Sequence, residues 1–207
     1  MNMPHILFIS FASFGRNAVG IMFYPYETYR RIANRGGALE LVYVGLLAML
    51  YFALASVVKV ATFRPFILTK HVVVLGGTAF VTYALAVWLI WAAGRRFGSK
   101  AAIRRVAVAW GYTMIPTVCW FFMTSFLYVV LPPPRTASAA GVAFSALFLA
   151  VSATLFFWKL TLGYLAIRFG LRLDLVRILA VAGIVGPLMA VWSWGMYRLG
   201  IFKVPFI

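Results

Sequence analysis

Few side chains in this chain of 207 residues have the chemistry of a catalytic site. The acidic residues number only three, Glu27, Glu40 and Asp174, against 19 lysines and arginines. A membrane enzyme would need His, Asp or Glu side chains clustered at one membrane face, and few are available to build such a cluster. Proton or sodium coupling usually relies on carboxylates inside the membrane, and none of the expected spans contains one.

Metal and nucleophile chemistry also lack their usual residues. The histidines are His5 and His71, and Cys119 is the single cysteine, so neither an intrachain disulfide nor a cysteine-based metal site can form. No Walker-type phosphate loop or His-Glu-x-x-His helix occurs. The serines in apolar runs lack a neighbouring base: Ser125, Ser145 and Ser152. We therefore expect no catalytic residue, no cofactor and no metal site.

The composition indicates a membrane protein. Hydrophobic residues make up 65% of the chain and charged residues 11%, whereas a soluble domain usually has about 25% charged residues. The net charge of +16 alone would be compatible with nucleic-acid binding. However, the basic residues lie between long apolar runs, which is the pattern of membrane topology, so we expect no nucleic-acid partner.

Five apolar runs are long enough to cross about 30 Å of hydrocarbon as helices. They cover residues 41–58, 72–93, 106–131, 137–158 and 178–197. The fold class expected is all-α, a polytopic membrane protein with five transmembrane helices. Pro116 predicts a kink within the third helix. Residues 160–175 are interpreted as a continuation of the fourth helix, followed by a turn near Gly170.

The N-terminal segment is apolar over residues 6–24 but holds Arg16 and Asn17 near its centre. A charged side chain in the middle of a span costs roughly 2.5–3.5 kcal/mol on insertion scales. This cost favours an interfacial or re-entrant segment, with a sixth span as the alternative. We therefore divide the chain into an N-terminal cytoplasmic or interfacial segment, residues 1–40, and a five-helix membrane domain, residues 41–207.

The distribution of basic residues predicts the orientation of the five spans. Thirteen lysines and arginines fall in segments on one side of the membrane and six on the other. Because basic residues are retained on the cytoplasmic side, the N-terminus is expected in the cytoplasm and the C-terminus outside.

The α-helical spans carry glycines that suit close contact between helices. These are the Gly76-Gly77 pair, Gly141, and Gly183 with the Gly186-Pro187 pair. Packing is the preferred interpretation, and the alternative is that the Gly186-Pro187 break lets the last helix bend during transport. Ser99 is expected to cap the start of the third span.

Basic residues at the ends of the spans are candidate contacts for lipid headgroups. Lys159 follows Trp158 at the predicted end of the fourth span, where either a bound anionic lipid or simple snorkelling accounts for it. The loop before the third span has five cations, and a role in setting the membrane topology would by itself explain their presence. The full candidate set is Arg95, Arg96, Lys100, Arg104, Arg105 and Lys159.

The segment at residues 95–116, RRFGSKAAIRRVAVAWGYTMIP, carries an order of residues that topology alone leaves unexplained. Gly98 precedes the Gly111-Tyr112 pair and Pro116, which resembles the third-helix signature of the Yip family of membrane proteins. The run YPYETYRRI at residues 24–32 looks like the opening of prokaryotic Yip members, with Pro25 and Glu27 as its motif positions. The resemblance covers roughly residues 25–197. The chain lacks the long N-terminal region and the Asp-Leu-Tyr-Gly-Pro type motif of eukaryotic relatives, so Rab binding is not carried over.

The resemblance implies an integral membrane scaffold or adaptor without catalytic residues, in the plasma (inner) membrane of a prokaryote. The expected partners are membrane lipids and either another membrane protein or a second copy of the chain. The alternative is a transport component that moves a lipid or amphiphile, alone or as an accessory subunit of an ABC-type exporter, since some bacterial relatives accompany such exporters. A membrane enzyme is the third hypothesis.

Overall fold

The computed structural model describes residues 3–59, 65–130 and 139–201, and the regular elements in these ranges are all α-helices. They are α1 (Met3–Phe23), α2 (Pro25–Arg35), α3 (Ala38–Lys59), α4 (Pro65–Arg96), α5 (Ile103–Gly111), α6 (Met114–Val130), α7 (Ala139–Leu171) and α8 (Leu175–Arg198). The all-α prediction is confirmed.

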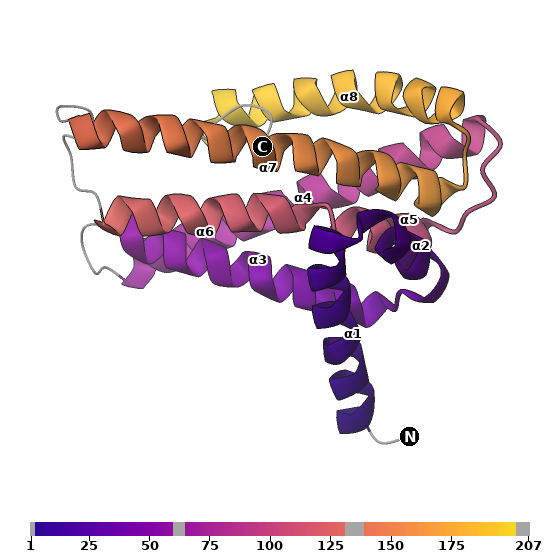
Figure 1. Cartoon of the computed structure of the whole chain (residues 1–207), viewed down its shortest axis with the longest axis horizontal. Coiled ribbons are helices and arrows are strands. Elements are labelled where there is room, and N and C mark those ends of the chain that lie inside the picture. Colours follow the sequence, from indigo (N-terminus) through magenta and orange to yellow (C-terminus); the bar gives the residue numbers. More distant parts are fainter. Residues whose placement is uncertain (1–2, 60–64, 131–138, 202–207) are drawn as a thin grey trace.

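The long helices form an elongated bundle. In Figure 1, α3, α4, α6, α7 and α8 run along the long axis of the molecule, with contacts between α3 and α4, α3 and α6, α4 and α8, and α6 and α7. The short helices α2 and α5 lie at one end of the bundle. At this same end α3 and α8 begin and α4 and α7 end, so the basic residues of these helix termini are brought to one end of the molecule.

Five stretches of the described chain are long and apolar enough to cross a membrane, as a polytopic protein requires. They are His5–Phe23, Val72–Arg96, Ile103–Thr124, Gly141–Leu171 and Leu175–Arg198. Four of them correspond to expected spans. The expected span at residues 41–58 lies in α3, and its described apolar part, Ala38–Leu54, is shorter than the five candidates. The remaining candidate, His5–Phe23, lies in the N-terminal segment.

Helix α1 is a continuous helix of 21 residues that differs in direction from the bundle. It runs across the long helices near their basic end, and its N-terminus points away from them (Figure 1). The Tyr43 hydroxyl of α3 still donates a hydrogen bond to the Leu7 carbonyl oxygen of α1 at 2.8 Å. Its length and composition alone would allow it to span a membrane. A helix at a large angle to the spans has the direction expected of an interfacial segment rather than of a sixth span.

The third expected span is interrupted in the turn that precedes Pro116, which is where a proline kink is expected. Helix α5 ends at Gly111 and α6 begins at Met114. At the break, the Thr113 hydroxyl donates a hydrogen bond to the Trp110 carbonyl oxygen at 2.7 Å. Pro116 then occupies the first turn of α6, where a missing backbone N–H is tolerated.

The predicted continuation of the fourth span is confirmed. Helix α7 has 33 residues and ends at Leu171, next to the expected turn near Gly170. Its length of about 50 Å exceeds the hydrocarbon thickness, so it must tilt or extend beyond the hydrocarbon. Arg172 follows with φ 57°, the left-handed conformation that commonly ends a helix.

The N-terminal segment and the bundle share one hydrophobic core. Tyr29 and Ile32 of α2 are buried together with Val108 of α5 and Leu162 of α7. In α2 the aromatic and aliphatic side chains that would anchor an interfacial helix in lipid therefore face the protein interior in part. Gly36, which follows α2, packs closely on α5, since an added Cβ would lie 2.9 Å from Val108 Cγ1.

Candidate functional site

The most unusual feature of the interior is a group of buried polar side chains at the basic end of the bundle. We call it the junction cluster, and it consists of Asn17 of α1, Arg31 of α2, Glu40 of α3 and Tyr112 after α5. Asn17 is 3% exposed and Glu40 is 4% exposed. A buried carboxyl group is costly unless hydrogen bonds compensate its desolvation.

The carboxyl group of Glu40 accepts three hydrogen bonds within the protein. Its Oε2 accepts from Asn17 Nδ2 at 2.9 Å and from the Tyr112 hydroxyl. Its Oε1 accepts from the backbone N–H of Gly37 at 3.1 Å. Because both oxygens are occupied and the residue is buried, Glu40 has no free face for a substrate.

The Asn17 amide is oriented by contacts on both of its sides. Its Oδ1 accepts a hydrogen bond from Arg31 Nε at 3.0 Å, and its Nδ2 donates to Glu40 and, at 3.3 Å, to the Tyr112 hydroxyl. The cluster thus joins α1, α2, α3 and the α5–α6 break. The arrangement fixes helix positions and offers no nucleophile or base to the outside.

Tyr29 lies beside this cluster in α2 but differs from it in one respect. Its side chain is fully buried, and its hydroxyl has no hydrogen-bond partner in the described chain. Burial, with a smaller contribution from Tyr112, raises the pKa of Tyr29 well above its usual value. The Tyr29 hydroxyl therefore stays neutral and serves as packing.

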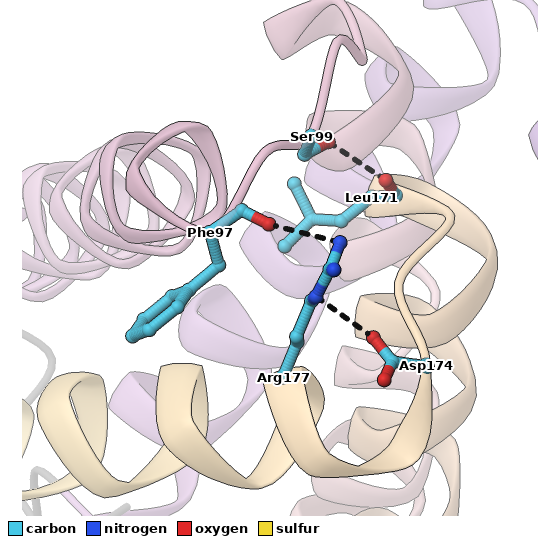
Figure 2. Close-up of polar contacts among 5 residues, drawn as sticks. All are labelled: Phe97, Ser99, Leu171, Asp174 and Arg177. Atoms are coloured by element: carbon cyan, nitrogen blue, oxygen red, sulfur yellow. Dashed lines mark hydrogen bonds and ion pairs between the residues drawn. The ribbon is translucent and has the colours of Figure 1, made fainter.

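A second polar region lies where the α4–α5 loop meets the α7–α8 turn (Figure 2). The Ser99 hydroxyl donates to the Leu171 carbonyl oxygen at 2.7 Å and accepts from the Ala101 N–H at 3.2 Å. The expected N-cap role of Ser99 is wrong, because Ala102 occupies the N-cap of α5 and no side chain caps it. Ser99 instead fastens the loop to the end of α7.

Arg177 of α8 also contacts this loop. Its Nη1 donates to the Phe97 carbonyl oxygen at 3.4 Å, and its Nε forms an ion pair of 3.2 Å with Asp174 (Figure 2). Both charged side chains are exposed, at 56% and 62%. Unlike Glu40, Asp174 remains in contact with solvent.

The Yip-like motif positions have separate structural roles. Pro25 is the first residue of α2, and Glu27 is exposed in its first turn. Gly98 adopts φ 89°, a conformation that other residues rarely adopt. The remaining three lie together at the α5–α6 break: Gly111, Tyr112 and Pro116.

Gly111 allows close packing at this break. An added Cβ would lie 2.5 Å from Leu41 Cδ2, so the residue admits α3 close to α5. Tyr112 is fully buried and reaches Glu40, as described above. The motif therefore coincides with the point where α3, α5 and α6 meet.

The candidate headgroup contacts divide into two groups. Arg95 and Arg96 end α4, and Lys100 and Arg104 lie in the following loop and the start of α5, all four exposed. Arg105 is half-buried beside them in sequence. Lys159 lies within α7, about 18 Å along the helix before Leu171, and is not brought together with the others.

The glycines expected at helix contacts also divide. Gly76 packs against α3, since an added Cβ would lie 2.7 Å from Met49 Sδ. Gly183 and Gly186 of α8 have open space where a side chain would be. The packing interpretation thus holds for Gly76 but not, within this chain, for the glycines of α8.

Asn17 and Arg31 were not predicted as site residues. The sequence places Asn17 near the centre of the apolar N-terminal segment and Arg31 within the expected interfacial segment, residues 1–40. No local sequence pattern marks them, because the hydrogen bonds of the cluster join residues that are far apart in the chain. The described residues contain no group of three His, Cys, Asp or Glu side chains that could hold a metal ion.

Comparison of the chain with known protein families, with curated proteins and with solved structures finds no match in any of the three. The resemblance to Yip proteins therefore stays a prediction. The class of molecule that the fold defines is a helical, membrane-embedded protein with several candidate spans.

Proposed function

We propose that this protein is a non-enzymatic membrane scaffold or adaptor that binds other membrane proteins through exposed helix faces. The observation that carries the proposal is the outer face of α8. Ala182, Gly183, Gly186 and Pro187 are exposed there, and the two glycines have no atom of this chain within reach of a side chain. The opposite face packs through Val181 and Val185 into the core.

A small-residue face has a particular meaning in a membrane. Lipid competes fully for apolar side chains, so helices associate where small residues allow their backbones to approach closely. Within this chain no other helix packs closely against Gly183 or Gly186 of α8. We infer that the occupant of this face is a transmembrane helix, from another membrane protein or from a second copy.

The acidic residues support the same function, because two of the three are already bound to other groups of the protein. Glu40 is fully hydrogen-bonded inside the protein, and Asp174 pairs with Arg177. This leaves Glu27 as the exposed acid without such a contact in the described chain. The proposal includes the resemblance to prokaryotic Yip proteins. It also places this protein in the plasma membrane, with the basic end of the bundle in the cytoplasm.

The test is the double variant Gly183→Leu/Gly186→Leu, with tagged protein cross-linked in native membranes, purified and analysed by mass spectrometry. The leucines should not disturb the fold, because the space is open. Recovery of the partner should fall by roughly 10-fold, as expected when a contact of 1–2 kcal/mol is lost. Gly45→Leu/Gly77→Leu is the matched control, since both of these glycines are also exposed with open space.

Two results would contradict the proposal. One is a wild-type protein that yields neither a partner nor a self-cross-link. The other is an equal loss of partner in the control and the α8 variant, which would mean that any added bulk in the spans has the same effect.

A transport component is the second candidate, favoured by interruptions in two candidate spans. One span is divided into α5 and α6, and α8 contains Pro187, which removes the backbone hydrogen bond to the Gly183 carbonyl. Such interruptions permit bending during movement of a lipid or amphiphile. Liposomes that contain the protein and a headgroup-labelled lipid should then show faster flipping than empty liposomes, and an unchanged rate would exclude passive movement.

A further inference from the structure

The cations around the α4–α5 loop form an exposed surface with little neutralising charge. We call this surface the basic corner and define it by Arg95, Arg96, Lys100, Arg104 and Arg177, all exposed. Asp174 is the carboxylate that pairs with one of them, Arg177. Arg95 stacks instead on Trp91, with 5.7 Å from its Cζ to the ring centroid.

The loop between α4 and α5, which carries Lys100, is held in place at several points. Ser99 is 6% exposed and links the loop to the end of α7, and Trp91 Nε1 donates to the Ala101 carbonyl oxygen at 3.1 Å. Gly98 reverses the chain with its positive φ. Lys100 therefore extends from a fixed loop, whereas Arg95 and Arg96 lie at the end of α4 and Arg104 at the start of α5. Figure 2 shows the Ser99 contact that holds this loop.

Exposed aliphatic side chains flank the cations. Ile103 of α5 is 44% exposed, and Leu175 and Val176 at the start of α8 are 56% and 73% exposed. Candidate spans end or begin here, at Arg96 and Leu175. A surface with both cations and aliphatic groups at the ends of spans matches the headgroup layer of a bilayer, where phosphate and acyl chain meet.

We infer that the basic corner is a binding site for the phosphate of an anionic phospholipid, with Leu175 and Val176 placed against its acyl chains. Lysine and arginine donate charge-assisted hydrogen bonds to phosphate oxygens. An acidic protein or a nucleic acid would use the cations but would leave the aliphatic side chains uncovered. This site is separate from the α8 face of the proposed function.

The experiment uses the full chain in mixed micelles or nanodiscs, with phosphatidylglycerol or phosphatidylcholine as the probe lipid, and retained lipid counted by native mass spectrometry. The wild type should retain phosphatidylglycerol preferentially. Arg96→Gln/Lys100→Gln should lower that preference by roughly 10-fold or more, because each cation near an anionic surface contributes to the binding free energy. Arg198→Gln is the charge control, since Arg198 is exposed at the far end of α8.

Ser99→Ala distinguishes a lipid site of fixed geometry from non-specific electrostatic attraction, because the substitution leaves the net charge unchanged. Release of the pinned loop should lower the preference several-fold, to a level between the wild type and the double variant. An unchanged preference in Ser99→Ala, or an equal fall in Arg198→Gln, would overturn the inference. If Ser99→Ala fails to fold, as judged by circular dichroism and elution, the comparison of the double variant with Arg198→Gln decides. Competition by soluble glycerol phosphate would indicate a free-phosphate site and would also overturn it.

Discussion

The junction cluster and the basic corner lie at the same end of the bundle, yet they use polar groups in opposite ways. In the junction cluster, side chains from different helices bind one another out of contact with water, and Glu40 accepts from three donors. In the basic corner a single buried hydroxyl, that of Ser99, binds a backbone carbonyl while the charges remain exposed. The first arrangement holds helices together, and the second leaves cations free for a ligand.

The difference teaches how a chain with so few acids distributes them. Glu40 is placed inside, where it satisfies the donors of α1 and the α5–α6 break. Asp174 neutralises part of the basic corner and no more. Arg31 is the cation that the junction cluster uses, whereas the five cations of the basic corner stay exposed.

The largest effect is expected from Glu40→Ala. The variant leaves Asn17, Tyr112 and the Gly37 N–H without their acceptor, and buried donors without partners are costly. We expect the free energy of unfolding to fall by about 3 kcal/mol or more, measured by reversible unfolding in mild detergent. Glu27→Ala is the control, because Glu27 is exposed and should change stability by less than about 0.5 kcal/mol. Equal effects of the two variants would mean that the cluster does not stabilise the fold.

Two buried tyrosines sharpen the comparison inside the cluster. Tyr112→Phe removes a hydroxyl that donates to Glu40 and accepts from Asn17, so a loss of about 1–2 kcal/mol in unfolding free energy is expected. Tyr29→Phe removes a hydroxyl that has no described partner, so stability should stay the same or rise slightly. Both tyrosines are fully buried, so the two substitutions change the packing to a similar extent and differ mainly in the hydrogen bonds that are lost. A larger loss for Tyr29→Phe than for Tyr112→Phe in the same unfolding assay would show that the assignment of hydrogen bonds is wrong.

Local pattern sufficed for the helices but not for the contacts between them. Apolar runs bounded by charges predicted most of the long helices, and the continuation of α7 past Lys159 followed from helix-forming residues. The interruption at Tyr112–Thr113 agrees with the kink predicted from Pro116, because a proline cannot donate to the carbonyl four residues before it, that of Tyr112. The contacts made at this interruption, the packing of Leu41 on Gly111 and the hydrogen bond from Tyr112 to Glu40, could not be predicted from the proline.

The junction cluster lay beyond prediction because its members are distant in the chain. Glu40 and Tyr112 are 72 residues apart, and Asn17 and Glu40 are 23 apart. Periodicity reports neighbours on one helix and carries no information on such pairs. The same limit affected α1, where the hydrogen bonds that join Asn17 to Glu40 and Arg31 could not be predicted.

The smallest effect on stability is expected from Asp174→Asn in the basic corner. An exposed ion pair contributes little, and asparagine is as good an N-cap residue as aspartate, so unfolding free energy should change by less than about 0.5 kcal/mol. The variant nevertheless removes the carboxylate next to Arg177, which should increase retention of phosphatidylglycerol over phosphatidylcholine. A destabilisation as large as that of Tyr112→Phe would show that the corner, like the junction cluster, is held together by its charges, and the contrast between the two regions would not stand.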